Sequence, residues 1–155
     1  MTMQTIHLTL NGRPLEVRAE PHETLLDLIR ERIGLTGTKM GCDEGDCGCC
    51  TLILDGKAVN SCLVLGVEAD GHTVDTVEGL AQGGELHPLQ EAFLHHGAVQ
   101  CGYCTPGMVL ASVSLIESGE ATDEDAIRLG LEGNLCRCTG YHNIVKAVAA
   151  AAGVS

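Results

Sequence analysis

The nine cysteines of this 155-residue chain fall into two groups, separated by 38 residues without a cysteine. The members are Cys42, Cys47, Cys49, Cys50 and Cys62 in the first group, and Cys101, Cys104, Cys136 and Cys138 in the second. The first ten residues alternate polar and apolar types and resemble no secretory signal, so we expect a cytoplasmic protein. Because cytoplasmic thiols are kept reduced, this many cysteines indicates metal ligands rather than disulfides.

The residues around the first group have the patterns of strands and one helix. Residues 5–10 and 15–18 lie on either side of an Asn-Gly pair, which is typical of a β-hairpin. Residues 51–54 and 58–59 flank an Asp-Gly pair and indicate a second hairpin. Between the hairpins, the leucine-rich residues 25–30 favour a helix that ends at a glycine. The pattern predicts a small twisted sheet with one helix across it.

The residues after position 76 favour helices instead. The predicted helices cover residues 87–96, 105–116, 126–131 and 141–152. Thr105 and Thr122 are predicted to cap the second and third of them. Four short helices are consistent with a compact bundle. We therefore predict an α+β fold, with a β-rich domain over residues 1–77 and a helical domain over residues 78–155.

The first group has the spacing C-x4-C-x2-C followed by a distant fourth cysteine, which is the plant-type [2Fe–2S] pattern. The ligands that this spacing favours are Cys42, Cys47, Cys50 and Cys62. Their loop must approach a cluster closely and direct N–H groups at its sulfurs, and Gly41, Gly45 and Gly48 permit that approach. Cys49 is the alternative to Cys50. A structural zinc ion is the alternative to the cluster, although zinc sites commonly use two paired knuckles.

The second group consists of a C-x2-C pair and a C-x-C pair that are 31 residues apart. By itself this pattern fits a zinc site, a redox dithiol or a cluster, although the βαβ context of a redox dithiol is missing. Both pairs are predicted to lie at the first turns of helices, because Cys104 precedes Thr-Pro and Cys138 precedes Thr-Gly. The free N–H groups and positive dipole of such turns favour an anionic thiolate cluster.

Three sequence strings, GCDEGDCGCCT, QCGYCTPGM and GNLCRCTGY, resemble those of the small iron–sulfur subunit of the xanthine oxidase family of molybdenum hydroxylases. The resemblance extends over nearly the whole chain. It implies a plant-type ferredoxin domain of the β-grasp type with one [2Fe–2S] cluster, followed by a four-helix-bundle domain with another. The implied ligands of the second cluster are Cys101, Cys104, Cys136 and Cys138.

The resemblance also implies a place in an electron-transfer chain. Electrons would pass from the molybdopterin (Mo) of a large partner subunit to the helical-domain cluster, then to the ferredoxin-domain cluster, and then to FAD in a medium partner subunit. Gln100 and Cys138 match family residues that lie near the molybdopterin, and the catalytic molybdenum site belongs to the partner. The implied assembly is a heterotrimer or a dimer of heterotrimers. Cys49 departs from the family, which usually has a small residue such as alanine there.

The composition limits the other partners. Nine basic and 21 acidic residues give a net charge of −12, which disfavours binding to nucleic acid and to anionic membranes. No apolar stretch predicts a membrane span, and no glycine-rich phosphate loop predicts a flavin or nicotinamide site in this chain. The rival interpretations are a free-standing two-cluster ferredoxin, a redox sensor and a zinc-stabilised interaction protein. Residues that select a substrate would belong to another chain.

Overall fold

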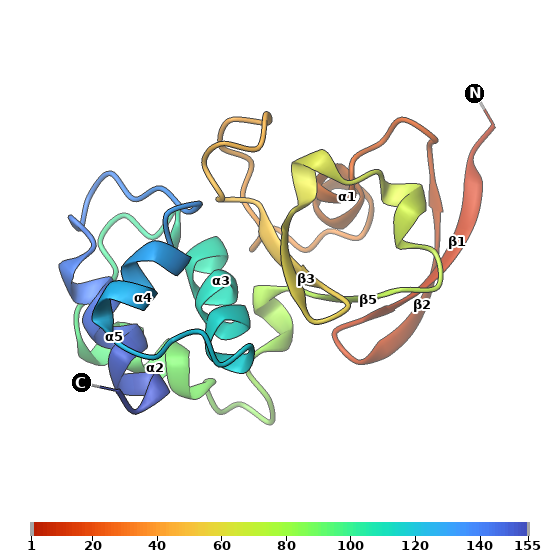
Figure 1. The fold of residues 1–155 in the computed structure, drawn as a ribbon. Helices are drawn as coiled ribbons and strands as arrows, with labels where there is room; N and C mark the ends of the chain where they lie inside the picture. The colour runs from red at the N-terminus through yellow and green to blue at the C-terminus, as the bar shows by residue number, and fades with distance from the viewer. Residues whose placement is uncertain (1, 155) are drawn as a thin grey trace.

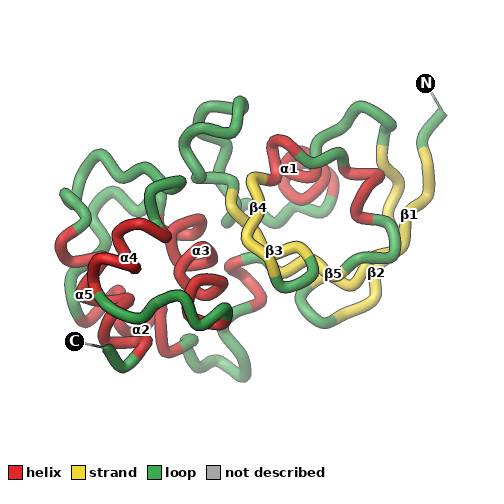
Figure 2. The backbone as a smooth tube through the Cα atoms, viewed as in Figure 1, coloured by secondary structure: helices red, strands yellow, loops and turns green. Residues whose placement is uncertain are grey.

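The computed structural model describes residues 2–154, which form two lobes (Figure 1). The strands and the first helix form one lobe, and the helices of the C-terminal half form the other (Figure 2). The loop that carries most of the first cysteine group, orange in Figure 1, rises from the sheet at the side nearer the helical lobe. The predicted α+β architecture, a sheet followed by helices, is confirmed.

Five strands form one mixed sheet in the order β2-β1-β5-β3-β4. The strands are β1 (Gln4–Leu10), β2 (Arg13–Ala19), β3 (Thr51–Leu54), β4 (Lys57–Asn60) and β5 (Thr73–Asp75). β1 is antiparallel to β2 and parallel to β5, whereas β3 is antiparallel to both β5 and β4. β5 was not predicted, because three residues are too few to show an alternating pattern. It nevertheless joins the two predicted hairpins into a single sheet.

Both hairpins turn at the pairs that the sequence indicated. The φ angles are 50° and 75° at Asn11 and Gly12, and 48° and 78° at Asp55 and Gly56. Two successive residues with positive φ are what a type I′ turn requires, and its twist matches that of the flanking strands. The turns therefore fix the register of both hairpins.

The predicted helix of the first lobe begins as α1 (Leu25–Asp27) and continues as a π-helical turn, η1 (Leu28–Arg32). The hydroxyl of Thr24 caps it by accepting a hydrogen bond from the Asp27 N–H at 3.1 Å. Leu25 and Leu28 lie in the core of this lobe. Three 3-10 turns complete this lobe, η2 (Ser61–Leu63), η3 (Gly66–Ala69) and η4 (Val77–Gly79).

The second lobe contains the four predicted helices, whose caps differ from the prediction. They are α2 (Pro88–His95), α3 (Thr105–Glu117), α4 (Glu124–Gly130) and α5 (His142–Ala152). The residue that precedes α3 is Cys104, so Thr105 already lies inside the helix. Asp123, not Thr122, caps α4, because its carboxylate accepts the Ala126 N–H at 2.8 Å. Within residues 2–154, no helix has the length and apolar character that crossing a membrane requires.

Helix α3 packs against both lobes. Met108, Val109 and Val113 belong to the core of the helical lobe. Leu110, on the same helix, is fully buried in the core of the sheet lobe, together with residues of β1 and β3. The two lobes therefore have separate cores that share one helix.

We expect Leu110→Ala to destabilise the sheet lobe although the residue belongs to the helical half of the sequence. Removing a fully buried leucine side chain costs about 2–5 kcal/mol, because apolar contacts are lost and a cavity remains. Leu129→Ala is the control, since Leu129 on α4 is 68% exposed. Chemical unfolding followed by circular dichroism measures both. Equal stability of the two variants would contradict the shared core.

Candidate metal centres

The loop of the first cysteine group directs backbone N–H groups at the Cys42 sulfur. The N–H groups of Glu44, Asp46 and Cys47 lie 3.5, 3.3 and 3.4 Å from Cys42 Sγ. The hydrogen bond from Glu44, followed by that from Cys47, lowers the pKa of the Cys42 thiol to about 7. A hydrogen bond to the charged form of a group favours that form. The loop is therefore built to hold an anionic sulfur at Cys42.

Cys50 and Cys62 form the buried side of the same group. Their sulfurs are 3.5 Å apart, and Leu26 packs against both residues. Burial, followed by the contact with Cys50, raises the pKa of the Cys62 thiol to about 12, although a hydrogen bond from the Gly45 N–H acts in the opposite direction. At neutral pH such a thiol loses its proton when a metal cation binds the sulfur, so metal binding and deprotonation are linked.

The thiols of the second group also lie in two contacting pairs. The Cys104 thiol contacts Cys136, and the Cys138 thiol contacts Cys101. Burial raises the pKa of Cys104 to about 12. Burial acts to raise the pKa of Cys136, but hydrogen bonds from Thr139, Cys138 and Cys104 together outweigh it and lower that pKa overall. Each pair of this group thus combines one cysteine from the first motif with one from the second.

A cavity of about 550 Å3 lies among the thiols of the second group. Its lining residues are Cys49, Cys101, Tyr103, Cys104, Leu135, Cys136, Arg137, Cys138 and Tyr141. Cys101 and Cys138 are exposed, whereas Cys104 and Cys136 are half-buried. Gln100 is exposed directly before Cys101. One edge of this centre therefore lies at the molecular surface.

The prediction that both pairs lie at helix starts is wrong for the second pair. Cys104 directly precedes α3, but Cys138 lies three residues before Tyr141, the residue that precedes α5. The chain turns between them, because Gly140 and Tyr141 have φ angles of 64° and 67°. The hydroxyl of Thr139 accepts the Tyr141 N–H at 3.2 Å and lies 3.0 Å from the Cys136 sulfur. A hydroxyl and a turn take the place of a helix terminus here.

The two cysteine segments are hydrogen-bonded to each other. The Leu135 N–H donates to the Cys47 carbonyl at 2.9 Å. The side-chain amide of Asn134 donates to the Gly48 carbonyl at 2.8 Å and to the Thr51 hydroxyl at 3.0 Å. Gly48 has a φ angle of 66°, and a Cβ there would lie 2.3 Å from the Gly133 carbonyl oxygen. Position 48 therefore requires glycine for its backbone conformation and for space.

Two tyrosines support this junction, and neither role could be read from the sequence pattern. The Tyr141 hydroxyl accepts the Cys136 N–H at 2.8 Å and donates to the Asn134 carbonyl at 3.2 Å. The Tyr103 hydroxyl donates to the Met40 carbonyl, two residues before Cys42. Asn134 and Tyr141 flank the Cys-x-Cys motif, and this position was their only signal in the sequence.

Glycines also bring the backbone close to the thiols. A Cβ on Gly41 would lie 2.6 Å from the Cys47 sulfur, and one on Gly45 would lie 2.5 Å from a Leu63 methyl group. All nine cysteines are free. Among residues 2–154, no three histidine, cysteine or acidic side chains converge on a point that could hold one metal ion. The thiols approach each other two by two.

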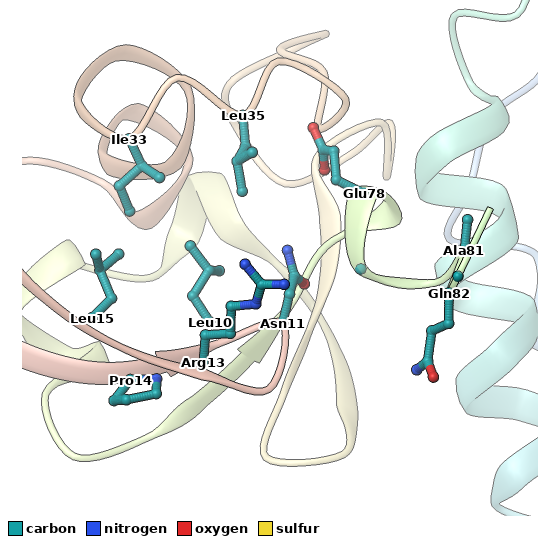
Figure 3. A pocket seen from close by; sticks show the side chains of 12 residues that line it. Leu10, Asn11, Arg13, Pro14, Leu15, Ile33, Leu35, Glu78, Ala81 and Gln82 are labelled. Atoms are coloured by element: carbon teal, nitrogen blue, oxygen red, sulfur yellow. The ribbon is translucent and has the colours of Figure 1, made fainter.

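A separate cavity of about 710 Å3 lies away from the thiols (Figure 3). It opens between the β1–β2 turn, the segment after η1 and the linker between the lobes. Leu10, Leu15, Ile33 and Leu35 supply its apolar wall, and the side chain of Arg13 lies beside Asn11 in Figure 3. No cysteine lines it, so it is no part of either thiol group.

Comparison with known proteins finds a family match for each half of the chain. The family described as "2Fe-2S iron-sulfur cluster binding domain" matches residues 8–81, and the one described as "[2Fe-2S] binding domain" matches residues 76–149. The nicotinate dehydrogenase small FeS subunit of Eubacterium barkeri is 48% identical over 96% of this chain and 94% of that protein. The xanthine dehydrogenase iron-sulfur-binding subunit of Escherichia coli O157:H7 is 46% identical over 93% and 91%.

A solved structure matches closely as well. A chain of quinoline 2-oxidoreductase from Pseudomonas putida 86 superposes with a TM-score of 0.95 at 45% identity. The match covers 99% of this chain and 96% of that chain. Sequence and structure thus agree over nearly the full length.

We expect Gly41→Ala to displace the Cys47 thiol, because the added methyl group would overlap its sulfur. If Cys47 is a ligand, one of two [2Fe–2S] clusters is lost and bound iron falls from about four to about two atoms per chain. Gly133→Ala is the matched control, since nothing lies within 4 Å of a Cβ there. Iron analysis of both purified variants checks this. Full iron content in Gly41→Ala would contradict the role of Cys47.

Proposed function

This chain belongs to the small iron–sulfur subunits of the xanthine oxidase family of molybdenum hydroxylases, and we propose that it conducts electrons between the cofactors of two partner subunits. Its role is electron transfer within an oxidoreductase complex through two [2Fe–2S] clusters. The observation that carries the proposal is the arrangement of eight thiols in four pairs, with a hydrogen bond that joins the two sets.

We assign the ligands by these pairs. In the ferredoxin domain, residues 1–77, Cys42 pairs with Cys47 and Cys50 pairs with Cys62. In the helical domain, residues 78–155, the pairs are Cys101 with Cys138 and Cys104 with Cys136. A [2Fe–2S] cluster would need four thiolate ligands, and the two pairs at each site would supply them. Cys49 is left outside both sets.

The residues around the thiols fit such clusters. When bound, each cluster accepts one electron and releases it again without making or breaking a bond to the protein. The N–H groups around Cys42 stabilise the negative charge of its sulfur, and hydrogen bonds to cluster sulfurs are known to set reduction potentials. Burial of Cys50 and Cys62 excludes water from the other end of that site. Thr139 supplies the corresponding hydrogen bond to Cys136.

A short bonded route connects the two sets. Cys47 carries the carbonyl that accepts the Leu135 N–H, and the next residue after Leu135 is Cys136. A ligand of one site is thus linked to a ligand of the other by backbone bonds and one hydrogen bond. Asn134 holds this contact in place through the neighbouring carbonyl of Gly48. We infer that electrons pass between the sites along this junction.

The exposed edge of the helical-domain centre is the face that we assign to the molybdopterin-binding partner. Cys101 and Cys138 are exposed there, beside Gln100 and the exposed apolar side chains of Tyr103 and Leu135. Gln100 and Cys138 would lie near the molybdopterin. FAD would be held by a second, medium-sized partner, which gives a heterotrimer or a dimer of heterotrimers. The reduced thiols that the clusters need favour a cytoplasmic location.

The decisive experiment is metal and flavin analysis of the complex purified from its native host through this chain. We expect about four iron atoms, about one molybdenum atom and one FAD for each copy of this chain. Iron without molybdenum or large partner chains would instead favour a free-standing two-cluster ferredoxin. Zinc with little iron would overturn the proposal.

We expect Leu135→Asp to reduce copurification with the molybdopterin-binding partner, because binding weakens by at least about tenfold, while iron content stays at about four atoms per chain. The change replaces an exposed apolar side chain of the proposed contact with a charge that must lose its water when the partner binds. The Leu135 N–H that contacts Cys47 belongs to the backbone and remains. Leu129→Asp is the control, since Leu129 is 68% exposed on α4 and does not line the cavity. Intact assembly of Leu135→Asp would show that another face binds the partner.

A further inference from the structure

The ninth cysteine, Cys49, is buried although it belongs to neither ligand set. Its side chain is 8% exposed, and it lies between Cys47 and Cys50 in the loop of the first group. A buried free cysteine elsewhere would count as a small apolar residue. The position of Cys49 is different, because thiols of both sets surround it.

Cys49 contacts both centres. It is the only residue of the ferredoxin domain among the residues that line the cavity of the helical-domain thiols. The Cys49 thiol also contacts the Cys47 sulfur. A Cβ placed on Gly41 would lie 2.6 Å from Cys47 Sγ and 3.4 Å from Cys49 Sγ. The Cys49 side chain therefore fills the space between the two sets of ligands.

The backbone holds Cys49 in this position. Its carbonyl accepts the Lys39 N–H at 3.3 Å, and a Cβ on Gly107 of α3 would lie 3.1 Å from the same oxygen. The preceding Gly48 carbonyl is bonded to Asn134. The main chain at Cys49 is therefore held on three sides.

An uncharged thiol in this place acts on the clusters by chemistry that alanine lacks. Its S–H group is a weak hydrogen-bond donor and its sulfur is polarisable. A donor or dipole beside a cluster sulfur stabilises the reduced cluster, which carries one more negative charge, and so raises its reduction potential. The nearest proposed ligand is Cys47, so the effect falls mainly on the ferredoxin-domain cluster.

We propose that Cys49 is a positioning residue for electron transfer, whose buried thiol raises the reduction potential of the ferredoxin-domain cluster relative to the helical-domain cluster. The inference rests on the proposed function, since it presupposes both clusters. In the step concerned, one electron moves from one cluster to the other, no bond forms or breaks, and the proton stays on Cys49. The higher potential draws the electron toward the ferredoxin-domain end of the subunit.

The test compares the wild-type complex with Cys49→Ala and Cys49→Ser. Redox titration followed by electron paramagnetic resonance gives the midpoint potential of each cluster, and Cys62→Ser assigns the signals by removing the ferredoxin-domain one. We expect Cys49→Ala to keep about four irons per chain. The midpoint potential of the ferredoxin-domain cluster should fall by about 59 mV relative to that of the helical-domain cluster, which changes the distribution of one electron between the clusters about tenfold. Cys49→Ser keeps a donor and should restore the wild-type distribution.

Three results would overturn this inference. Unchanged potentials in Cys49→Ala with full iron content would show that the thiol only fills space. Loss of half the iron in Cys49→Ala would show that Cys49 is itself a ligand. An equal shift in Cys49→Ser would show that packing, not the donor, sets the potential. Absence of two clusters in the wild-type protein would be a failure of the proposed function, which the iron analysis separates from these outcomes.

Discussion

The two halves of this molecule are joined through the backbone carbonyls of Cys47 and Gly48. A loop that wraps around thiols cannot form a regular hydrogen-bonded structure, yet its buried polar groups still need partners. Leu135 and Asn134 supply these partners, and they come from the segment that carries the other cysteine group. Each cysteine loop therefore completes the hydrogen bonding of the other. The distance between the two thiol sets follows from this junction and not from the linker between the domains.

Helix α3 strengthens the junction by packing. It begins beside Cys104, and its glycine at position 107 lets the helix approach so closely that a Cβ would lie 2.4 Å from the Gly48 carbonyl oxygen. Farther along, Leu110 enters the core of the sheet lobe. The same helix thus begins directly after a cysteine of one centre, supports the loop of the other and connects both cores. With one phenylalanine and no tryptophan in the chain, such sharing gives two small lobes enough buried apolar surface.

Local signals in the sequence predicted both hairpins and the helices, but neither the central strand β5 nor the contacts between the parts. Asn-Gly and Asp-Gly pairs located both hairpins, because only a few residue types adopt positive φ readily. The helix caps were misplaced by one residue, since Asp123 and Thr122 are both good caps and the choice depends on the final turn. Cysteine spacing divided the thiols into two groups. The bond between Asn134 and Gly48 joins residues 86 positions apart, and no local pattern predicts such a contact.

The thiols differ in exposure in a way that suits a carrier of electrons. Cys50 and Cys62 lie deep in the sheet lobe, whereas Cys101 and Cys138 reach the surface of the helical lobe. The other members of the two groups, Cys42, Cys47, Cys104 and Cys136, are half-buried, so each centre has a more buried side and a more exposed side. The junction passes between the half-buried Cys47 and Cys136. The route between the centres is therefore shielded from water, while Cys101 and Cys138 stay open to contact with a partner.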